Sequence, residues 1–208
     1  MPKHSTLRVD ANMAWDGPEA LENLRALERV GIQCVEQPLA TSDLEGQTKL
    51  VRETPTEIIA DESFTDCASL ELLLSRRACT GINVRISKCG GLVAAARRCE
   101  EASNAGLTVQ IGCQVGESSL LSAAQLVLIS AAPQAKYLEG CFGKHLLQED
   151  PVHPCLQFSY GGRPPKLPAG AGLGVKVDER ELNRWVGKRA VIELPRQTTK
   201  EKHHVTYR

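Results

Sequence analysis

Residues 34–63 read CVEQPLATSDLEGQTKLVRETPTEIIADES, and this stretch decides the fold. Two short β-rich runs, CVEQPL and EIIADES, enclose a helical segment over residues 44–54, and Pro38 ends the first run. A strand, a helix and a second strand in this order predict a parallel strand–helix–strand unit.

The same alternation continues on both sides of this unit. Further strands are expected at 7–12, 82–88, 107–113 and 137–142, with helices at 18–30, 67–78, 92–104 and 118–131. Strands that alternate with helices of near-equal length predict an α/β fold whose parallel sheet is covered by helices. Closure toward a barrel is favoured over an open, doubly wound sheet.

Composition limits the classes of partner. The 208 residues are 42% hydrophobic but only 4% aromatic, so the core must be mainly aliphatic. Lys plus Arg balance Asp plus Glu at 25 each, which favours a small-molecule partner and neither nucleic acid nor an acidic membrane surface. No stretch approaches the roughly 20 apolar residues of a membrane span, and no leader peptide is expected. The eight cysteines contain no CxxC pair, so we expect mostly buried free thiols in a reducing cytoplasm.

Three acids stand at the carboxyl ends of three consecutive predicted strands: Asp10 in RVDAN, Glu36 in VEQP and Asp61 in IADES. Their intervals are 26 and 25 residues, each one strand-plus-helix unit, so all three should reach one barrel mouth. Converging carboxylates repel one another unless a cation lies between them, and hard oxygen ligands favour Mg²⁺, with Mn²⁺ also possible. The alternative is that each acid has a local partner at its own strand end.

Lys88 follows Asp61 by 27 residues, at the end of NVRISK, so the same repeat brings it to the same mouth. A lysine at the end of a buried strand is costly to desolvate unless neighbouring carboxylates partner it. One interpretation is a general base whose pKa is lowered by burial and by the metal ion and raised by nearby carboxylates. The other is an ion pair with Asp61, and both can hold at once.

Further residues could contact a substrate at this mouth. Asn12 and Glu62 flank the predicted ligands, and Glu117 follows the strand at 107–113. Glu117 is equally well explained as an acid in the first turn of the next helix, where the helix dipole favours negative charge. No histidine stands at a position suited to a Cys–His nucleophile.

The motifs VDAN (9–12), VEQP (35–38), IADES (59–63) and NVRISKCGG (83–91) together resemble the enolase superfamily, in its mandelate racemase/muconate lactonizing enzyme family. The Lys88 strand, without the Asp–His pair of the racemase branch, resembles the muconate-lactonizing branch. The resemblance covers most of residues 7–143. It implies a partial TIM-type (β/α)7β barrel, like the enolase C-terminal domain. It also implies that Asp10, Glu36 and Asp61 bind Mg²⁺ and that Lys88 is the acid/base.

The resemblance further implies an isomerase or lyase that removes the proton next to a carboxylate, giving an enolate stabilised by the metal. Racemases, epimerases and cycloisomerases of EC class 5 fit this chemistry, as do dehydratase-type lyases. The implied substrate is a small carboxylate, and the complete enzyme is expected to be a homo-oligomer. A barrel enzyme of another kind, with aldol or hydrolytic chemistry, is the remaining enzymatic alternative.

The sequence departs from the branch in two elements that it does not contain. Members carry another lysine, in a Lys-x-Lys motif that ends the second strand, and an N-terminal capping domain; this sequence starts at the equivalent of the third strand. We therefore expect part of a longer enzyme, or a barrel completed by another polypeptide. The alternative is a truncated or vestigial non-catalytic fragment that at most binds metal.

Three regions are expected along the chain. Residues 1–149 should hold barrel strands three to eight with their helices. Residues 150–196, rich in Pro and Gly, should form a C-terminal extension that packs on the barrel or completes the cap. The polar residues 197–208 should be a disordered tail.

Overall fold

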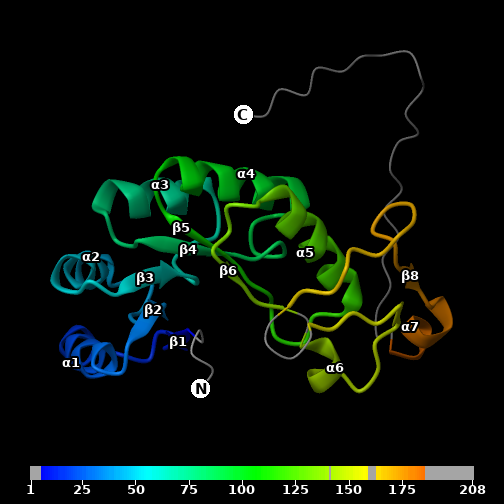
Figure 1. Cartoon of the computed structure of the whole chain (residues 1–208), viewed down its shortest axis with the longest axis horizontal. Coiled ribbons are helices and arrows are strands. Elements are labelled where there is room, and N and C mark those ends of the chain that lie inside the picture. The colour runs from blue at the N-terminus through cyan, green and yellow to red at the C-terminus, as the bar shows by residue number, and fades with distance from the viewer. Residues whose placement is uncertain (1–5, 141, 159–162, 186–208) are drawn as a thin grey trace, which may run out of the picture.

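The computed structural model describes residues 6–140, 142–158 and 163–185. Six parallel strands form one sheet in chain order, which curls into a half-barrel (Figure 1). The strands are β1 (Leu7–Asp10), β2 (Ile32–Glu36), β3 (Glu57–Ala60), β4 (Gly81–Val84), β5 (Thr108–Ile111) and β6 (Tyr137–Leu138). The predicted α/β fold with a partial barrel is confirmed.

Five helices connect successive strands and lie along the outer side of the sheet (Figure 1). They are α1 (Gly17–Glu28), α2 (Leu44–Glu53), α3 (Cys67–Arg76), α4 (Leu92–Asn104) and α5 (Ser119–Ala131). Asp16, Asp43 and Asp66 begin the first three, and each side chain accepts a hydrogen bond from a backbone N–H of the first turn. These caps fix where each loop ends and hold the strand ends in place.

The hydrophobic core lies between the sheet and the helices. Ile82 and Val84 of β4 and Val109 of β5 pack with residues of α3, α4 and α5 in one large cluster. The opposite, inner face of the sheet has a separate and much smaller apolar cluster, Cys34, Ile59 and Tyr137. Since side chains alternate between the two faces of a strand, the inner positions are left for polar groups.

All six strands end two to four residues earlier than predicted, and β4 shows a physical reason. β4 ends at Val84, and the chain then turns, with Cys89 N donating to Arg85 O at 2.9 Å and Gly91 N to Ile86 O at 2.9 Å. Ile86 and Cys89 bury their side chains in the large core cluster, which stabilises the turn against an extended continuation. Lys88 therefore stands on a turn beyond the strand.

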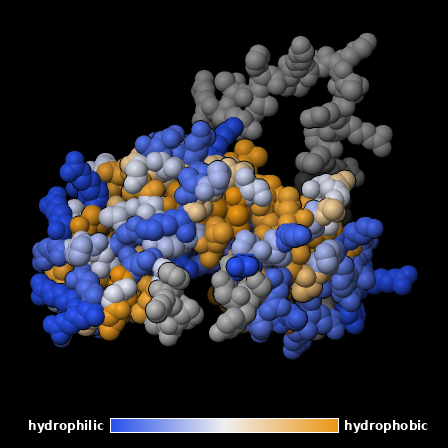
Figure 2. All heavy atoms as spheres, in the orientation of Figure 1, coloured by the Kyte–Doolittle hydropathy of each residue, from blue (hydrophilic) through white to orange (hydrophobic). Residues whose placement is uncertain are grey.

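The C-terminal region adds α6 (Gly143–Leu146), an antiparallel pair of β7 (Val152–His153) and β8 (Lys176–Val177), and α7 (Glu179–Trp185). Leu156 packs against Ala123 and Leu126 of α5. Figure 2 shows hydrophobic residues gathered where Figure 1 places α5, a helix that is apolar around most of its surface. The predicted tail at 197–208 falls outside the described residues.

The described part of the chain contains no helix with the length and apolar character needed to cross a membrane. Its cysteines are free thiols, and Cys34, Cys79, Cys89 and Cys99 are buried. Burial raises the pKa of Cys79 and of Cys99 to about 12, so these side chains remain protonated.

Candidate active site

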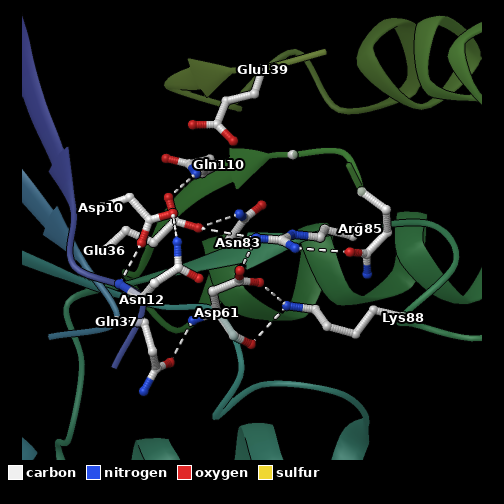
Figure 3. A network of polar contacts seen from close by, with 12 residues as sticks. Asp10, Asn12, Glu36, Gln37, Asp61, Asn83, Arg85, Lys88, Gln110 and Glu139 are labelled. Carbon is white, nitrogen blue, oxygen red and sulfur yellow. Dashed lines mark hydrogen bonds and ion pairs between the residues drawn. The ribbon is translucent and has the colours of Figure 1, made fainter. Parts of the chain in front are cut away.

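The predicted acids meet at one edge of the sheet. Asp10 and Glu36 are the last residues of β1 and β2 and lie opposite each other in the strand register. Asp61 follows β3 directly, and the turn after β4 brings Lys88 to the same edge (Figure 3). The parallel strands thus place all four side chains at their carboxyl ends, as the repeat spacing predicts.

Two buried amides hold the Glu36 carboxylate. Asn83 Nδ2 donates to Glu36 Oε1 at 2.6 Å, and Gln110 Nε2 donates to Oε2 at 2.7 Å. Glu36 is 4% exposed and both amide residues are fully buried. Each carboxylate oxygen therefore has a hydrogen-bond donor that carries no charge.

Two cations contact Asp61, which is 1% exposed. Lys88 Nζ donates to the Asp61 carbonyl oxygen at 2.7 Å and pairs with Oδ1, while Arg85 pairs with Oδ2. Arg85 Nη2 also lies 3.6 Å from Glu36 Oε1, so one guanidinium bridges two of the predicted ligands. The ion pair expected from the sequence between Lys88 and Asp61 is present.

Gln37 fixes the backbone next to this pair. Its Oε1 accepts from Asp61 N at 2.9 Å and from Ser63 N at 3.0 Å, and its Nε2 donates to Leu39 O at 2.8 Å. Gln37 has a φ of 35°, an unfavourable value for a residue with a side chain, and the hydrogen bonds stabilise it there. The end of β2 is thereby attached to the end of β3.

Asn12 contacts Asp10 instead of pointing away from it. Its backbone N and its Nδ2 donate to the two Asp10 carboxylate oxygens at 2.9 and 3.1 Å. Burial raises the pKa of Asp10, and the neighbouring charges of Glu36 and Glu62 raise it further. The hydrogen bond from the Asn12 backbone and the charge of Arg85 act in the opposite direction and lower this pKa.

Glu117 lies before α5, because Ser118 is the N-cap residue. Its interpretation as an acid in the first helical turn is therefore wrong. Glu117 Oε1 instead accepts from Gln114 N at 2.8 Å, and burial raises the pKa of its carboxyl. It lines a pocket of about 590 Å³ beside Val115 and Leu121.

Glu62, the remaining predicted substrate contact, has a buried Oε2 without a hydrogen-bond partner.

Two groups of the site titrate near neutral pH. Burial and the charge of Glu36 raise the pKa of Glu139 on the loop after β6 to about 7. Burial, followed by the charge of Arg85, lowers the pKa of Lys88 to about 8. A lysine with this pKa gives up its proton far more readily than an exposed one, as a general base must.

The donor set of Asp10, Glu36 and Asp61 suits a hard divalent cation by its chemistry, because all six side-chain oxygens belong to carboxylates. The charge of Glu36 raises the pKa of Asp10, and the charges of Glu36 and Asp10 raise the pKa of Glu139, an effect that a bound cation would relieve. Arg85 and Lys88 compete with such an ion for Asp61.

A second group of possible metal ligands lies elsewhere in the described residues. Its three ligand atoms all lie within 4.8 Å of one another. This group is His153, Asp178 and Glu181, on β7 and at the start of α7. The carboxylate oxygens of Asp10, Glu36 and Asp61 do not form such a group of three. His153 is largely exposed, and Asp178 accepts hydrogen bonds from backbone N–H groups as the cap of α7.

Sequence reasoning missed several polar residues of the site: Arg8, Asn83 and Gln110 within β1, β4 and β5, and Arg85 and Glu139 just past β4 and β6. A signal was available, because Asn83 and Gln110 interrupt the apolar runs INV and TVQI at inner-face positions.

Comparisons with known proteins agree with this fold. The family described as "Enolase C-terminal domain-like" matches residues 1–181. The chain is similar to the chloromuconate cycloisomerase of Cupriavidus pinatubonensis, at 29% identity over 181 residues, which are 87% of this chain and 48% of the relative.

Two solved structures are similar in fold. The muconate lactonizing enzyme from Pseudomonas putida has a TM-score of 0.80 and 30% identity over 88% of this chain and 50% of its own. The dipeptide epimerase from Cytophaga hutchinsonii, complexed with Mg and the dipeptide D-Ala-L-Val, has a TM-score of 0.78 and 28% identity over 86% of this chain and 48% of its own. The chain spans about half the length of the relatives that it matches.

Proposed function

Because this chain belongs to the enolase C-terminal domain-like family, we propose that it carries the metal-binding and proton-transferring part of an isomerase of the muconate-lactonizing type. Relatives that are cycloisomerases and epimerases support an isomerase kind of reaction. The proposed substrate is a small carboxylate with a proton on the adjacent carbon. Since the chain spans about half the length of these relatives, metal binding and proton removal are proposed for its own residues, and the complete reaction is proposed by analogy with the relatives.

Asp10, Glu36 and Asp61 would hold the metal ion, Mg²⁺ or Mn²⁺. The magnesium in the dipeptide epimerase complex supports this choice, as does the all-carboxylate donor set of the chain. When bound, the ion supplies positive charge that stabilises the negative charge developing on the substrate as its proton leaves.

Lys88 would take the proton at Nζ. The contact of Nζ with Asp61 is the observation that carries this proposal, because it fixes the amine at the edge that holds all three carboxylates. The lowered pKa, about 8, makes the neutral amine accessible near physiological pH. Arg85 and Asp61 keep the amine oriented, and its burial excludes bulk water as a competing base.

Proton exchange in deuterated water tests the function. The protein is incubated with Mg²⁺ and a panel of dipeptides, N-acylamino acids and unsaturated dicarboxylates, and deuterium uptake next to the carboxylate is followed by NMR. We expect uptake with the wild type and none with Lys88→Met. Magnesium binding without exchange for any member of the panel would favour the alternative of a non-catalytic, metal-binding barrel fragment.

A further inference from the structure

We propose that Asn83 and Gln110 are positioning residues that fix the Glu36 carboxylate for cation binding, and that Arg8 acts on Glu36 through Gln110. This inference rests on the proposed metal site. The four residues come from β4, β5, β2 and β1, and their side chains meet on the inner face of the sheet (Figure 3 labels all but Arg8).

The first step is that both carboxylate oxygens of Glu36 have an amide donor. Each carboxylate oxygen accepts one amide N–H, at 2.6 Å from Asn83 and 2.7 Å from Gln110. The two donors come from two different strands, so the carboxylate cannot rotate without breaking a buried hydrogen bond. Because the two amide donors are neutral, they do not compensate the negative charge of Glu36, whose charged neighbour is Arg85 at 3.6 Å from Oε1, and each oxygen keeps a further lone-pair site for a cation.

The second step is the orientation of Gln110. An amide can present either its oxygen or its nitrogen to a neighbour, and only the nitrogen can donate to Glu36. Arg8 Nη1 donates to Gln110 Oε1 at 2.7 Å, and a guanidinium has no acceptor, so the amide nitrogen must face Glu36. Arg8 is itself held by Glu139 at 3.5 Å and stacks over the Tyr137 ring at 4.8 Å.

The third step is the space that Asn83 needs. A Cβ atom at Gly112, just past the end of β5, would lie 2.2 Å from Asn83 Oδ1. Asn83 can therefore reach Glu36 only because residue 112 is glycine. A substitution at Gly112 therefore perturbs the contact between Asn83 and Glu36 without removing a polar group.

Manganese binding by the full 208-residue chain tests the proposal, with free Mn²⁺ followed by EPR and the affinity checked by calorimetry. We expect Gln110→Met, which keeps the side-chain length but loses the donor, to weaken binding about 10- to 100-fold, as is typical for residues that orient a metal ligand. Gly112→Ala should weaken binding to a similar extent as Gln110→Met.

Gln125→Leu is the matched control. Gln125 is also a buried glutamine, 2% exposed, but its Nε2 donates to the backbone oxygens of Gly112 and Glu139 and to no carboxylate. Gln110→Met and Gln125→Leu should lower the melting temperature similarly, whereas only the former should weaken Mn²⁺ binding. Circular dichroism establishes that each variant is folded, and Gly112→Ala, which adds no charge and removes no polar group, decides if Gln110→Met is not.

The two proposals fail in different ways. If the wild type binds Mn²⁺ and the Gln110 and Gly112 variants bind it equally well, positioning is overturned and the metal site stands. If Gln125→Leu weakens binding as much as Gln110→Met does, the effect is a general loosening and positioning is likewise overturned. If the wild type binds no Mn²⁺, the metal site fails and positioning fails with it.

Discussion

Lys88 and Asp61 meet at two points, the amine donating to the backbone oxygen of Asp61 at 2.7 Å and pairing with its carboxylate. The side chain of Lys88 is 11% exposed and that of Asp61 is 2% exposed, so the pair is shielded from water. The amine is therefore a rigid part of the site, and it adds positive charge where a metal ion would bind.

Replacing this lysine should strengthen metal binding. Lys88→Met removes a positive charge close to Asp61, so Mg²⁺ affinity should rise, by about tenfold for charges separated by a few ångströms in a partly buried site. Titration calorimetry measures the change. Lys136→Met is the control, because Lys136 pairs with Glu57 near the amino ends of the strands, and unchanged affinity is expected there. Weaker Mg²⁺ binding by Lys88→Met would contradict the idea that the Lys88 amine competes with the metal ion for Asp61.

Asp61→Asn should abolish Mg²⁺ binding measurable by calorimetry, because it removes the charge of a predicted ligand while keeping its shape. The matched control is Asp66→Asn, which changes the exposed N-cap residue of α3. Asparagine caps helices about as well as aspartate, so this control should fold and bind like the wild type. Equal affinities of the wild type and Asp61→Asn would show that the ligand assignment is wrong.

Glu57 should contribute acid-sensitive stability. It accepts hydrogen bonds from Lys136 at 2.7 Å, Tyr137 at 2.8 Å and Thr108 at 3.0 Å. Burial acts to raise the pKa of Glu57, but these hydrogen bonds outweigh it and lower the pKa below the ordinary 4.5. A lowered carboxyl pKa stabilises the fold fully above the unfolded-state pKa, and the contribution is lost as the pH falls through the folded-state pKa.

Glu57→Gln should therefore lower the free energy of unfolding at pH 7 by about 1–2 kcal/mol. The difference from the wild type should shrink below pH 4.5, as denaturant titrations at several pH values would show. Glu53→Gln is the control, since Glu53 forms an exposed i,i+4 pair with Lys49 at 3.8 Å, and such pairs contribute little. A pH-independent difference for Glu57→Gln would rule out the ionised carboxylate as its cause.

Gly81→Ala should destabilise the sheet. An added Cβ would lie 2.5 Å from Ile59 Cδ1 and 2.7 Å from the backbone oxygen of Thr108, and the latter cannot move without disturbing β5. We expect a loss of about 1–3 kcal/mol, as for other overpacked positions, visible in thermal melts. Gly17→Ala is the control, because nothing lies within 4 Å of its added Cβ at the start of α1. Equal melting temperatures for both variants would contradict this packing.

The fold was predictable because the outer face of the strands is apolar and the inner face carries mostly polar side chains. Outward residues such as Ile58 and Val84 carry a continuous apolar pattern, and Asp43 and Asp66 mark helix starts. The end of β4 was not predictable, because Ile86 is apolar and β-branched and suits either a strand or the buried turn that it forms.

The candidate site was only partly predictable for a related reason. Charged residues near the carboxyl ends of the strands recur at the repeat spacing, which led to the acids Asp10, Glu36 and Asp61 and to Lys88. The contacts that hold them depend on which amide faces which carboxylate across the sheet, as with Gln110 and Glu36. Sequence spacing carries no such information, since these partners are 74 positions apart.

The separation of the apolar core from the inner face has an evolutionary consequence. Residues that bury the helices and residues that line the site alternate along the same strands but share few neighbours. Substitutions on the inner face can therefore accumulate without loosening the helix packing, and the scaffold can exchange one substrate or reaction for another while its folding is maintained by the other half of its positions.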